Sequence, residues 1–325
     1  MKADVLASLM QADGYVSGEA LSEKLGISRS AVWKAVKALR SQGYEIESAT
    51  NRGYRLLYAP DFLNAENLRI YLKTRELAKH IYWKKVTGST NDDAKAAGPL
   101  CPDKSLFAAE QQKGGKGRLG RQWVSPMSEN IYMSLLLKPD IEPDRLSPIT
   151  LLAGLAVREA VCDVCMVDAQ IKWPNDVLAG GKKICGILAE MVCELDKINC
   201  VVLGIGINVN QEVFPPEIGK KATSLKLEGG RKVDRAVLAC AVLERFEHYY
   251  DAFLKEGLTK EVLKRYEDNC INIGAKVTAQ TGGQAVSGVA TGVLPTGELV
   301  INTGGKTVFV KSGEVTLQSF YQEES

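Results

Sequence analysis

The first sixty residues carry three short helical patterns followed by a β pattern. Ser17 and Ser28 each stand just before an apolar run with helical spacing, as helix N-caps do, and Gly26 separates the two runs. An alternating stretch then surrounds Asn51-Arg52-Gly53, which favours a β-hairpin turn. Three helices and a hairpin in this order predict a winged helix-turn-helix domain over residues 1–60.

Strand patterns dominate residues 81–270, and residues 61–80 connect them to the first domain. Strand-like apolar runs occur at 81–86, 106–110, 131–137, 171–172, 184–191 and 198–207. Helical patterns occur at 64–74, 91–97, 145–164, 234–256 and 258–268. Because strands mostly follow one another and Gly180-Gly181 is typical of a hairpin, we predict a mixed sheet of the α+β class, not a doubly wound fold.

Residues 271–325 change character again. Short β-rich runs are separated there by glycine-containing turns at 282–283, 295–297 and 304–305. Such runs predict a small β-barrel as a third domain.

The composition is that of an ordinary globular protein. The chain has 325 residues, 45% hydrophobic and 25% charged, which is enough for two or three domains. It shows neither a signal-peptide pattern nor a run of roughly 18 apolar residues, so we expect a cytoplasmic protein. Two histidines disfavour a Ser-His-Asp hydrolase. Cys162 and Cys165 fit helix packing better than a metal or redox site.

Basic residues concentrate on the third helical pattern. Residues 28–42 contain four Lys or Arg and no acid, whereas the whole chain has a net charge of only +2. Basic residues on a capped helix and a wing fit contacts with DNA, and the alternative is a basic face for protein contacts. The candidate DNA-binding residues are Ser28, Arg29, Ser30, Trp33, Lys34, Lys37 and Arg52.

Two further segments suggest nucleotide chemistry. Residues 114–123 combine four glycines, three cationic side chains and Trp123, a set suited to phosphates and a base, although a flexible loop has the same composition. Lys172-Trp173-Pro174-Asn175-Asp176 offers a carboxylate for a magnesium bound to phosphates, and it could instead be a strand end with a core Trp. Neither segment is a P-loop or a Rossmann fingerprint.

These segments belong to a set of five motifs that resembles the biotin protein ligases. The others are Gly88-Ser89-Thr90-Asn91, Lys183 to Leu188 and Gly204 to Asn210, while Gln111-Gln112 precedes the glycine-rich segment. With the N-terminal domain, the chain is similar to the bifunctional type, biotin-[acetyl-CoA-carboxylase] ligase and biotin operon repressor. The resemblance implies a class II synthetase-like central domain at 81–270 and an SH3-like barrel at 271–325.

The resemblance also implies a reaction. Biotin and ATP form biotinyl-5'-AMP, and a lysine of a biotin carboxyl carrier protein then takes the biotin. The implied catalytic residues are Arg118, Lys183 and Asp176, with Asp176 holding Mg²⁺. The implied biotin-binding residues are Ser89, Thr90, Asn91, Gln112, Lys116, Gly117, Arg118, Lys183, Gly186 and Leu188. The implied ATP-binding residues are Arg118, Arg121, Trp123, Lys172, Asn175, Asp176 and Asn208.

Regulation follows from the same resemblance. With biotinyl-AMP bound, two chains are expected to pair and bind a two-fold operator as a repressor of biotin genes. Two positions depart from the family pattern, because Lys116 and Gln318 stand where many members have Arg. The alternatives are a lipoate-type acyl ligase joined to a DNA-binding domain and a non-catalytic biotin-responsive regulator. Ser89, Thr90 and Asn91 could also simply cap a helix.

Overall fold

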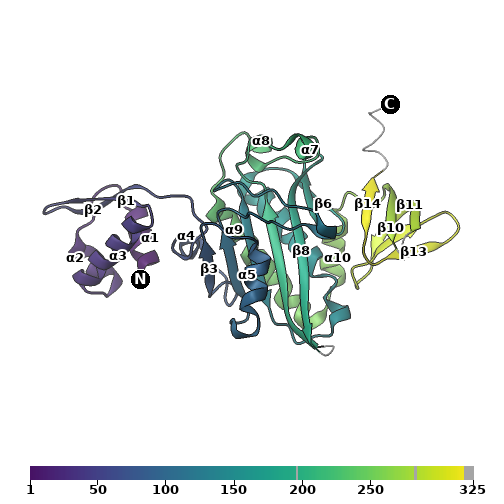
Figure 1. Cartoon of the computed structure of the whole chain (residues 1–325), viewed down its shortest axis with the longest axis horizontal. Helices are drawn as coiled ribbons and strands as arrows, with labels where there is room; N and C mark the ends of the chain where they lie inside the picture. The colour runs from purple at the N-terminus through teal and green to yellow at the C-terminus, as the bar shows by residue number, and fades with distance from the viewer. Residues whose placement is uncertain (195–196, 282–283, 318–325) are drawn as a thin grey trace.

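The computed structural model describes residues 1–194, 197–281 and 284–317, which form three separate β-sheets. A two-stranded sheet lies toward one end of the molecule, a seven-stranded sheet forms its centre and a five-stranded sheet lies toward the other end (Figure 1). The chain therefore has three structural parts that follow one another in sequence order.

The N-terminal part is a helix-turn-helix with a β wing, as the pattern predicts. Its elements are α1 (Lys2–Met10), α2 (Gly18–Leu25), α3 (Arg29–Ser41), β1 (Glu45–Ala49) and β2 (Gly53–Tyr58). Ser17 accepts a hydrogen bond from the Ala20 N–H at 3.0 Å and Ser28 accepts one from Ala31 at 3.2 Å, so both serines cap helices. Buried apolar residues of all three helices and β1 form a core of their own.

Helix α4 (Ala65–Tyr71) joins the N-terminal part to the centre. It packs against α1 on one side and against α9 (Arg235–Glu256) on the other. The Tyr44 hydroxyl donates to Asn67 Oδ1 at 2.6 Å, and the Asn67 amide donates to the Pro60 carbonyl at 2.9 Å. The connection is thus held by buried polar contacts as well as by packing.

The central sheet is mixed, as expected for an α+β domain. Its strands are β3 (Ile81–Lys84), β4 (Ser105–Ala109), β5 (Ile131–Leu137), β6 (Ala169–Lys172), β7 (Asp176–Ala179), β8 (Lys182–Glu194) and β9 (Lys197–Ile207), in the order β3-β4-β5-β9-β8-β7-β6. Only β3 and β4 run parallel. Gly180-Gly181 forms the predicted turn between β7 and β8, and both residues have positive φ.

Each face of this sheet packs against different helices. On β5, Leu135 and Leu137 join the large core with α6 (Ile149–Ala160) and α9, whereas Leu136 joins a smaller core with Ala94 of α5 (Thr90–Ala97). Side chains alternate between the faces because a strand has a period of two. The other helical elements are η1 (Gly98–Leu100), η2 (Arg118–Gly120), α7 (Pro216–Gly219), α8 (Leu225–Gly229) and α10 (Lys260–Glu267).

The helix predicted at 145–164 is interrupted. A 3-10 turn, η3 (Pro143–Leu146), precedes α6, and a π-helical turn, η4 (Val161–Cys165), follows it. The predicted start was wrong because Pro148 has no N–H with which to continue a helix from the preceding turn. Cys162 and Cys165 lie in the π turn, and Cys165 is buried in the core.

The C-terminal part is an antiparallel sheet. It contains β10 (Lys276–Thr281), β11 (Gln284–Val293), β12 (Leu299–Asn302), β13 (Thr307–Val310) and β14 (Glu314–Leu317), in the order β13-β12-β11-β10-β14. The strands β13 and β14 are the edges and do not pair within the described residues, so the sheet is not closed into a barrel by hydrogen bonds there. The turn predicted at 282–283 and Gln318 lie outside the described residues.

Trp173 secures the C-terminal sheet to the central one. Its indole is fully buried, its backbone N–H donates to Asn272 Oδ1 at 2.8 Å, and its Nε1 donates to the Gly297 carbonyl at 3.0 Å. The alternative interpretation of this Trp as a core residue is therefore correct. Among the helices that the structure describes, none has the length and apolarity needed to cross a membrane.

Candidate functional site

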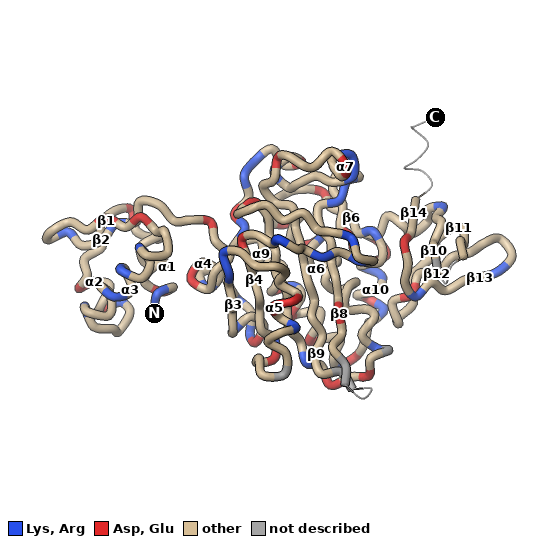
Figure 2. Tube along the Cα trace, in the orientation of Figure 1, with Lys and Arg blue, Asp and Glu red and all other residues tan. Residues whose placement is uncertain are grey.

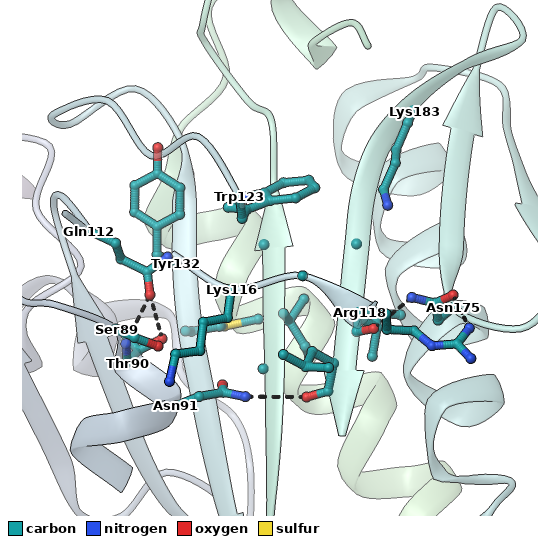
Figure 3. Close-up of a pocket in the computed structure, with 18 residues that line it drawn as sticks. Ser89, Thr90, Asn91, Gln112, Lys116, Arg118, Trp123, Tyr132, Asn175 and Lys183 are labelled. Atoms are coloured by element: carbon teal, nitrogen blue, oxygen red, sulfur yellow. Dashed lines mark hydrogen bonds between the residues drawn. The ribbon is translucent and has the colours of Figure 1, made fainter. Parts of the chain in front are cut away.

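A pocket opens over β8 and β9, and most of the predicted site residues line it. The polar side chains of Ser89, Thr90 and Gln112 lie on one side, Arg118 and Lys183 lie on the other, and Trp123 lies between them (Figure 3). The predicted residues that line the pocket are Ser89, Thr90, Asn91, Gln112, Lys116, Gly117, Arg118, Trp123, Asn175, Lys183, Gly186 and Leu188. Arg121, Lys172, Asp176 and Asn208 are not among the lining residues.

The floor of the pocket is made of glycines. A Cβ added to Gly206 would lie 2.7 Å from the Trp123 indole, and one added to Gly204 would lie 2.2 Å from Asn91 Oδ1. Gly204 and Gly206 share one face of β9 because they are two residues apart, and Gly186 pairs with Gly206 across the sheet. No larger residue fits at these positions, so the glycines let Trp123 and Asn91 lie against the backbone.

A chain of hydrogen bonds holds the glycine-rich segment, residues 114–123, next to the polar side. The Thr90 N–H donates to Gln112 Oε1 at 2.9 Å, and Gln112 Nε2 donates to Ser125 Oγ at 3.1 Å. Ser125 in turn donates to the Trp123 carbonyl at 3.0 Å. Ser89 precedes α5, but its side chain makes no capping hydrogen bond, which removes the helix-cap interpretation for this residue.

The opposite side of the pocket carries positive charge. Lys183 Nζ lies 2.6 Å from Asp176 Oδ1, an ion-pair distance without the angles of a directed hydrogen bond. Arg118 Nη1 donates to Asn175 Oδ1 at 2.9 Å. Burial lowers the pKa of the Arg118 guanidinium and of the Lys172 amine, because desolvation disfavours their charged forms. Partly buried cations of this kind fit an anionic ligand.

Two of the four predicted residues that do not line the pocket, Arg121 and Asn208, contact neighbouring segments. Arg121 Nη2 pairs with Glu314 Oε2 of β14 at 2.6 Å, which brings the C-terminal sheet to the glycine-rich segment. Asn208 is buried and donates to the Thr223 carbonyl at 3.1 Å. In addition, Lys116 pairs with Asp92 of α5 at 2.7 Å.

Trp123 fills much of the pocket. The cavity that remains open has a volume of about 50 Å³, whereas pockets for small ligands generally measure about 300–1,000 Å³. The indole Nε1 is buried without a hydrogen-bond partner.

Sequence reasoning missed several residues of the pocket. Tyr132, Met133 and Ile205 line it, while Ser134 and Glu190 support it from beneath through Asn91. The paired glycines of Gly204-Ile205-Gly206 were the available signal, because their spacing places both on one strand face. Ser134 and Glu190 offered no signal, since they read as ordinary strand residues.

The seven predicted DNA-binding residues form an exposed surface on α3 and the wing. All seven are exposed, and Figure 2 shows basic positions on α3 and at the wing. Lys37 Nζ lies 5.2 Å from the centre of the Trp33 ring, and the Arg52 guanidinium lies 4.2 Å from the Tyr15 ring. Arg40 instead donates to the Ile46 carbonyl and so ties α3 to the wing.

Comparison with known proteins identifies two families along the chain. Residues 2–55 match the HTH domain family, and residues 83–208 match the biotin/lipoate A/B protein ligase family. The fold and the pocket are therefore those of a protein ligase with a DNA-binding domain. The chain is 36% identical to the bifunctional ligase/repressor BirA of Bacillus subtilis over 98% of both chains. It belongs to the family of bifunctional biotin ligase/repressors.

Two further biotin ligases match about three quarters of this chain or slightly less. The biotin–[acetyl-CoA-carboxylase] ligase of Mycobacterium tuberculosis is 36% identical over 70% of this chain and 85% of its own. The structure of the Aquifex aeolicus biotin protein ligase in complex with biotin and ATP superposes with a TM-score of 0.65, at 31% identity, over 74% of this chain and 99% of that one.

Proposed function

We propose that this protein activates biotin with ATP to biotinyl-5'-AMP and transfers the biotin to a lysine of a biotin carboxyl carrier protein. The observation that carries the proposal is one pocket with neutral polar groups at one side and Arg118 and Lys183 at the other, with Asp176 paired to Lys183 just outside the lining. A neutral ureido ring fits the first side, and the reacting carboxylate and phosphates fit the second.

The reaction needs charge neutralisation and positioning, without a covalent enzyme nucleophile. The biotin carboxylate attacks the α-phosphorus of ATP and pyrophosphate leaves. Lys183 stands on the rim beside Trp123, 5.5 Å from its ring centre, where it would hold the carboxylate near the phosphate. Arg118, oriented by Asn175, would neutralise negative charge on the phosphates. Arg121 and Lys172 would add further positive charge around them. Trp123 would then pack against adenine, and Asn208 would shape the nucleotide side.

Mg²⁺ would be held chiefly by the phosphates of ATP, with Asp176 as its protein ligand. Asp176 Oδ1 is buried and lacks a directed hydrogen bond, which fits a carboxylate that can accept a metal. Within the described residues, no group of three or more His, Cys, Asp or Glu side chains could hold a metal without substrate. The ion would add positive charge to the phosphates when ATP binds.

The same chain would act as a repressor of biotin genes when biotinyl-AMP is bound. The exposed set on α3 and the wing supports contact with operator DNA, with Trp33, Lys34 and Lys37 nearest the bases. Pairing of two chains would place two α3 helices on a two-fold operator. Helix α3 and the pocket lie in separate parts of the chain, so the ligand would act on DNA binding through this pairing of chains or through the connection at α4.

The separation into three sheets supports the domain boundaries that we propose. We place the DNA-binding domain at 1–60, the connection at 61–80, the class II synthetase-like catalytic domain at 81–270 and the SH3-like domain at 271–325. The antiparallel strand order of the C-terminal sheet supports this last proposal. Consumption of ATP is the reason to expect the enzyme in the cytoplasm.

The first experiment is biotin-dependent exchange of labelled pyrophosphate into ATP in the presence of Mg²⁺, with lipoate as the parallel substrate. Exchange with biotin alone would support the proposal without knowledge of the acceptor. Exchange with lipoate would move the protein to the lipoate-type ligases. Absence of exchange from a folded sample that still binds biotin would favour a non-catalytic regulator.

A further inference from the structure

Asn91 is held from both ends of its side-chain amide. Its Nδ2 donates to Glu190 Oε2 of β8 at 2.7 Å, and its Oδ1 lies 2.6 Å from Ser134 Oγ of β5. Gly204 closes the remaining side, since any Cβ there would collide with Oδ1. The orientation of the Asn91 amide is therefore set by its neighbours.

Glu190 is the group that decides this orientation. Its Oε1 accepts from Lys95 Nζ at 2.9 Å, and the side chain is 29% exposed. Burial opposes its ionisation, but hydrogen bonds from Lys95 and Asn91 outweigh burial and lower the pKa of the carboxyl. An ionised carboxylate only accepts hydrogen bonds, so the amide nitrogen of Asn91 must face it.

The direction of the next two hydrogen bonds follows. Asn91 Oδ1 is an acceptor, so the single hydroxyl hydrogen of Ser134 must point to it. Ser134 Oγ lies 2.7 Å from Thr90 Oγ1 and must then accept the Thr90 hydrogen. Gln112 Oε1 is a second acceptor for the Thr90 hydroxyl, at the longer distance of 3.2 Å, and it also accepts from the Thr90 N–H at 2.9 Å.

The result is a chain of hydrogen bonds from Glu190 through Asn91 and Ser134 to Thr90, in which each donor is fixed by the one before it. We call this chain the relay, and it ends at the pocket. Thr90 lines the pocket, and its hydroxyl hydrogen is used by Ser134, so a ligand that meets this hydroxyl meets a hydrogen-bond acceptor. Such a group fits an N–H donor, and a ureido ring carries two of them. Reversal of the amide would turn the Ser134 hydrogen toward Thr90 and release the Thr90 hydrogen, for Gln112 or for a donor contact with the ligand.

We propose that Glu190 is a positioning residue for ligand recognition, which orients Asn91, Ser134 and Thr90 so that the pocket presents an acceptor to a ureido N–H. This inference deepens the proposed biotin site and rests on it. Glu190 itself lies outside the set of residues that line the pocket.

The test compares Glu190→Leu with the unaltered chain in biotin-dependent pyrophosphate exchange. Loss of a partner for a buried polar group costs about 1–3 kcal/mol, so the KM for biotin should rise roughly tenfold to a hundredfold. The kcat should stay within about threefold, because the reacting carboxylate lies at the other side of the pocket. Glu190→Gln offers one carbonyl oxygen to two donors, so its KM for biotin should lie between those of Glu190→Leu and the unaltered chain. Glu261→Leu, at an 86% exposed glutamate, is the control and should change neither constant.

A double-mutant cycle with Thr90→Val separates the relay from a structural role. Glu190 and Thr90 share no hydrogen bond, so independent effects would add. The relay instead requires that Glu190→Leu cause little further loss once the Thr90 hydroxyl is absent. Additive losses, or a biotin KM within about twofold of the unaltered value in a folded Glu190→Leu protein, would overturn the inference.

If Glu190→Leu does not fold, Ser134→Ala replaces it in the double-mutant cycle with Thr90→Val. This variant tests the same relay, because it removes the hydroxyl between Asn91 and Thr90. Failure of the proposed function looks different, because the unaltered chain would then show no exchange with biotin at all.

Discussion

The DNA-binding surface and the pocket of this protein are built in opposite ways. The surface uses exposed residues that follow one another along α3, and a local pattern suffices to place them. The pocket uses side chains from α5, the glycine-rich segment, β5 and β8, held by partners elsewhere in the chain. Substitutions at the surface should therefore weaken individual contacts with DNA. Substitutions of the residues that support the pocket should instead destabilise the whole central domain.

The buried ion network around Glu110 tests this contrast most strongly. Glu110 and Arg235 are fully buried, with Arg235 Nη2 2.9 Å from Glu110 Oε2, and Arg235 also pairs with Asp61 of the connection. Glu110 Oε1 accepts from the Leu63 N–H and from Trp83 Nε1, at 2.7 and 2.8 Å. Glu110 thus fastens the connection to the strand that leads into the glycine-rich segment.

We expect Glu110→Ala to lower the free energy of unfolding by about 3–5 kcal/mol, because it leaves a buried guanidinium without its partner. Urea denaturation followed by tryptophan fluorescence measures this loss. Lys34→Ala, at an exposed position of α3, should stay within about 0.5 kcal/mol of the unaltered chain. Equal stability of both variants would contradict the contrast between the exposed surface and the buried supports of the central domain.

Lys183→Ala tests the charged side of the pocket. Removal of a charge that stabilises the transition state should lower kcat/KM for biotin-dependent exchange about 10²- to 10³-fold. Lys182→Ala, at the exposed neighbouring residue, is the control and should retain activity. Binding of the ligand-free chain to DNA should be unaffected by either change. Full activity of Lys183→Ala would remove Lys183 from the catalytic set.

Lys37→Ala tests the surface itself. A duplex of mixed sequence offers no specific base contact, so loss of the Lys37 charge should weaken binding by about tenfold at most and reduce the salt slope of log K by about one. Fluorescence anisotropy at several salt concentrations measures both values. Lys24→Ala on α2 is the matched control, and exchange of pyrophosphate should be normal in both variants. An unchanged slope would exclude Lys37 from the DNA contact.

The smallest expected effect is at the Lys116–Asp92 ion pair, where this chain departs from the family pattern. Both side chains are about half exposed, so their coupling should not exceed about 1 kcal/mol and should shrink in high salt. Lys116→Gln, Asp92→Asn and the double variant, compared by the rate of biotinyl-AMP release, measure it. A coupling of zero at low salt would mean that the pair does not help to hold the glycine-rich segment closed.

Much of the site was predictable from the sequence because its motifs carry side chains of distinctive chemistry. Twelve of the predicted residues line one pocket, although their motifs are separated by up to about a hundred positions. The remaining four are not among the lining residues, and Trp173 proved to be a core residue. The helix start at 145 was missed because periodicity alone does not register the break at Pro148.

The sequence by itself determined the local structure: helix caps at Ser17 and Ser28, the hairpin at Gly180-Gly181 and the charge of α3, because caps, turns and periodicity depend on near neighbours. Only the tertiary structure decided which polar groups meet. The pairing of β5 with β9 and of β9 with β8 brings Ser134, Glu190 and the glycine floor beneath Asn91. Strand order fixes these meetings, and it depends on packing between segments far apart in the chain.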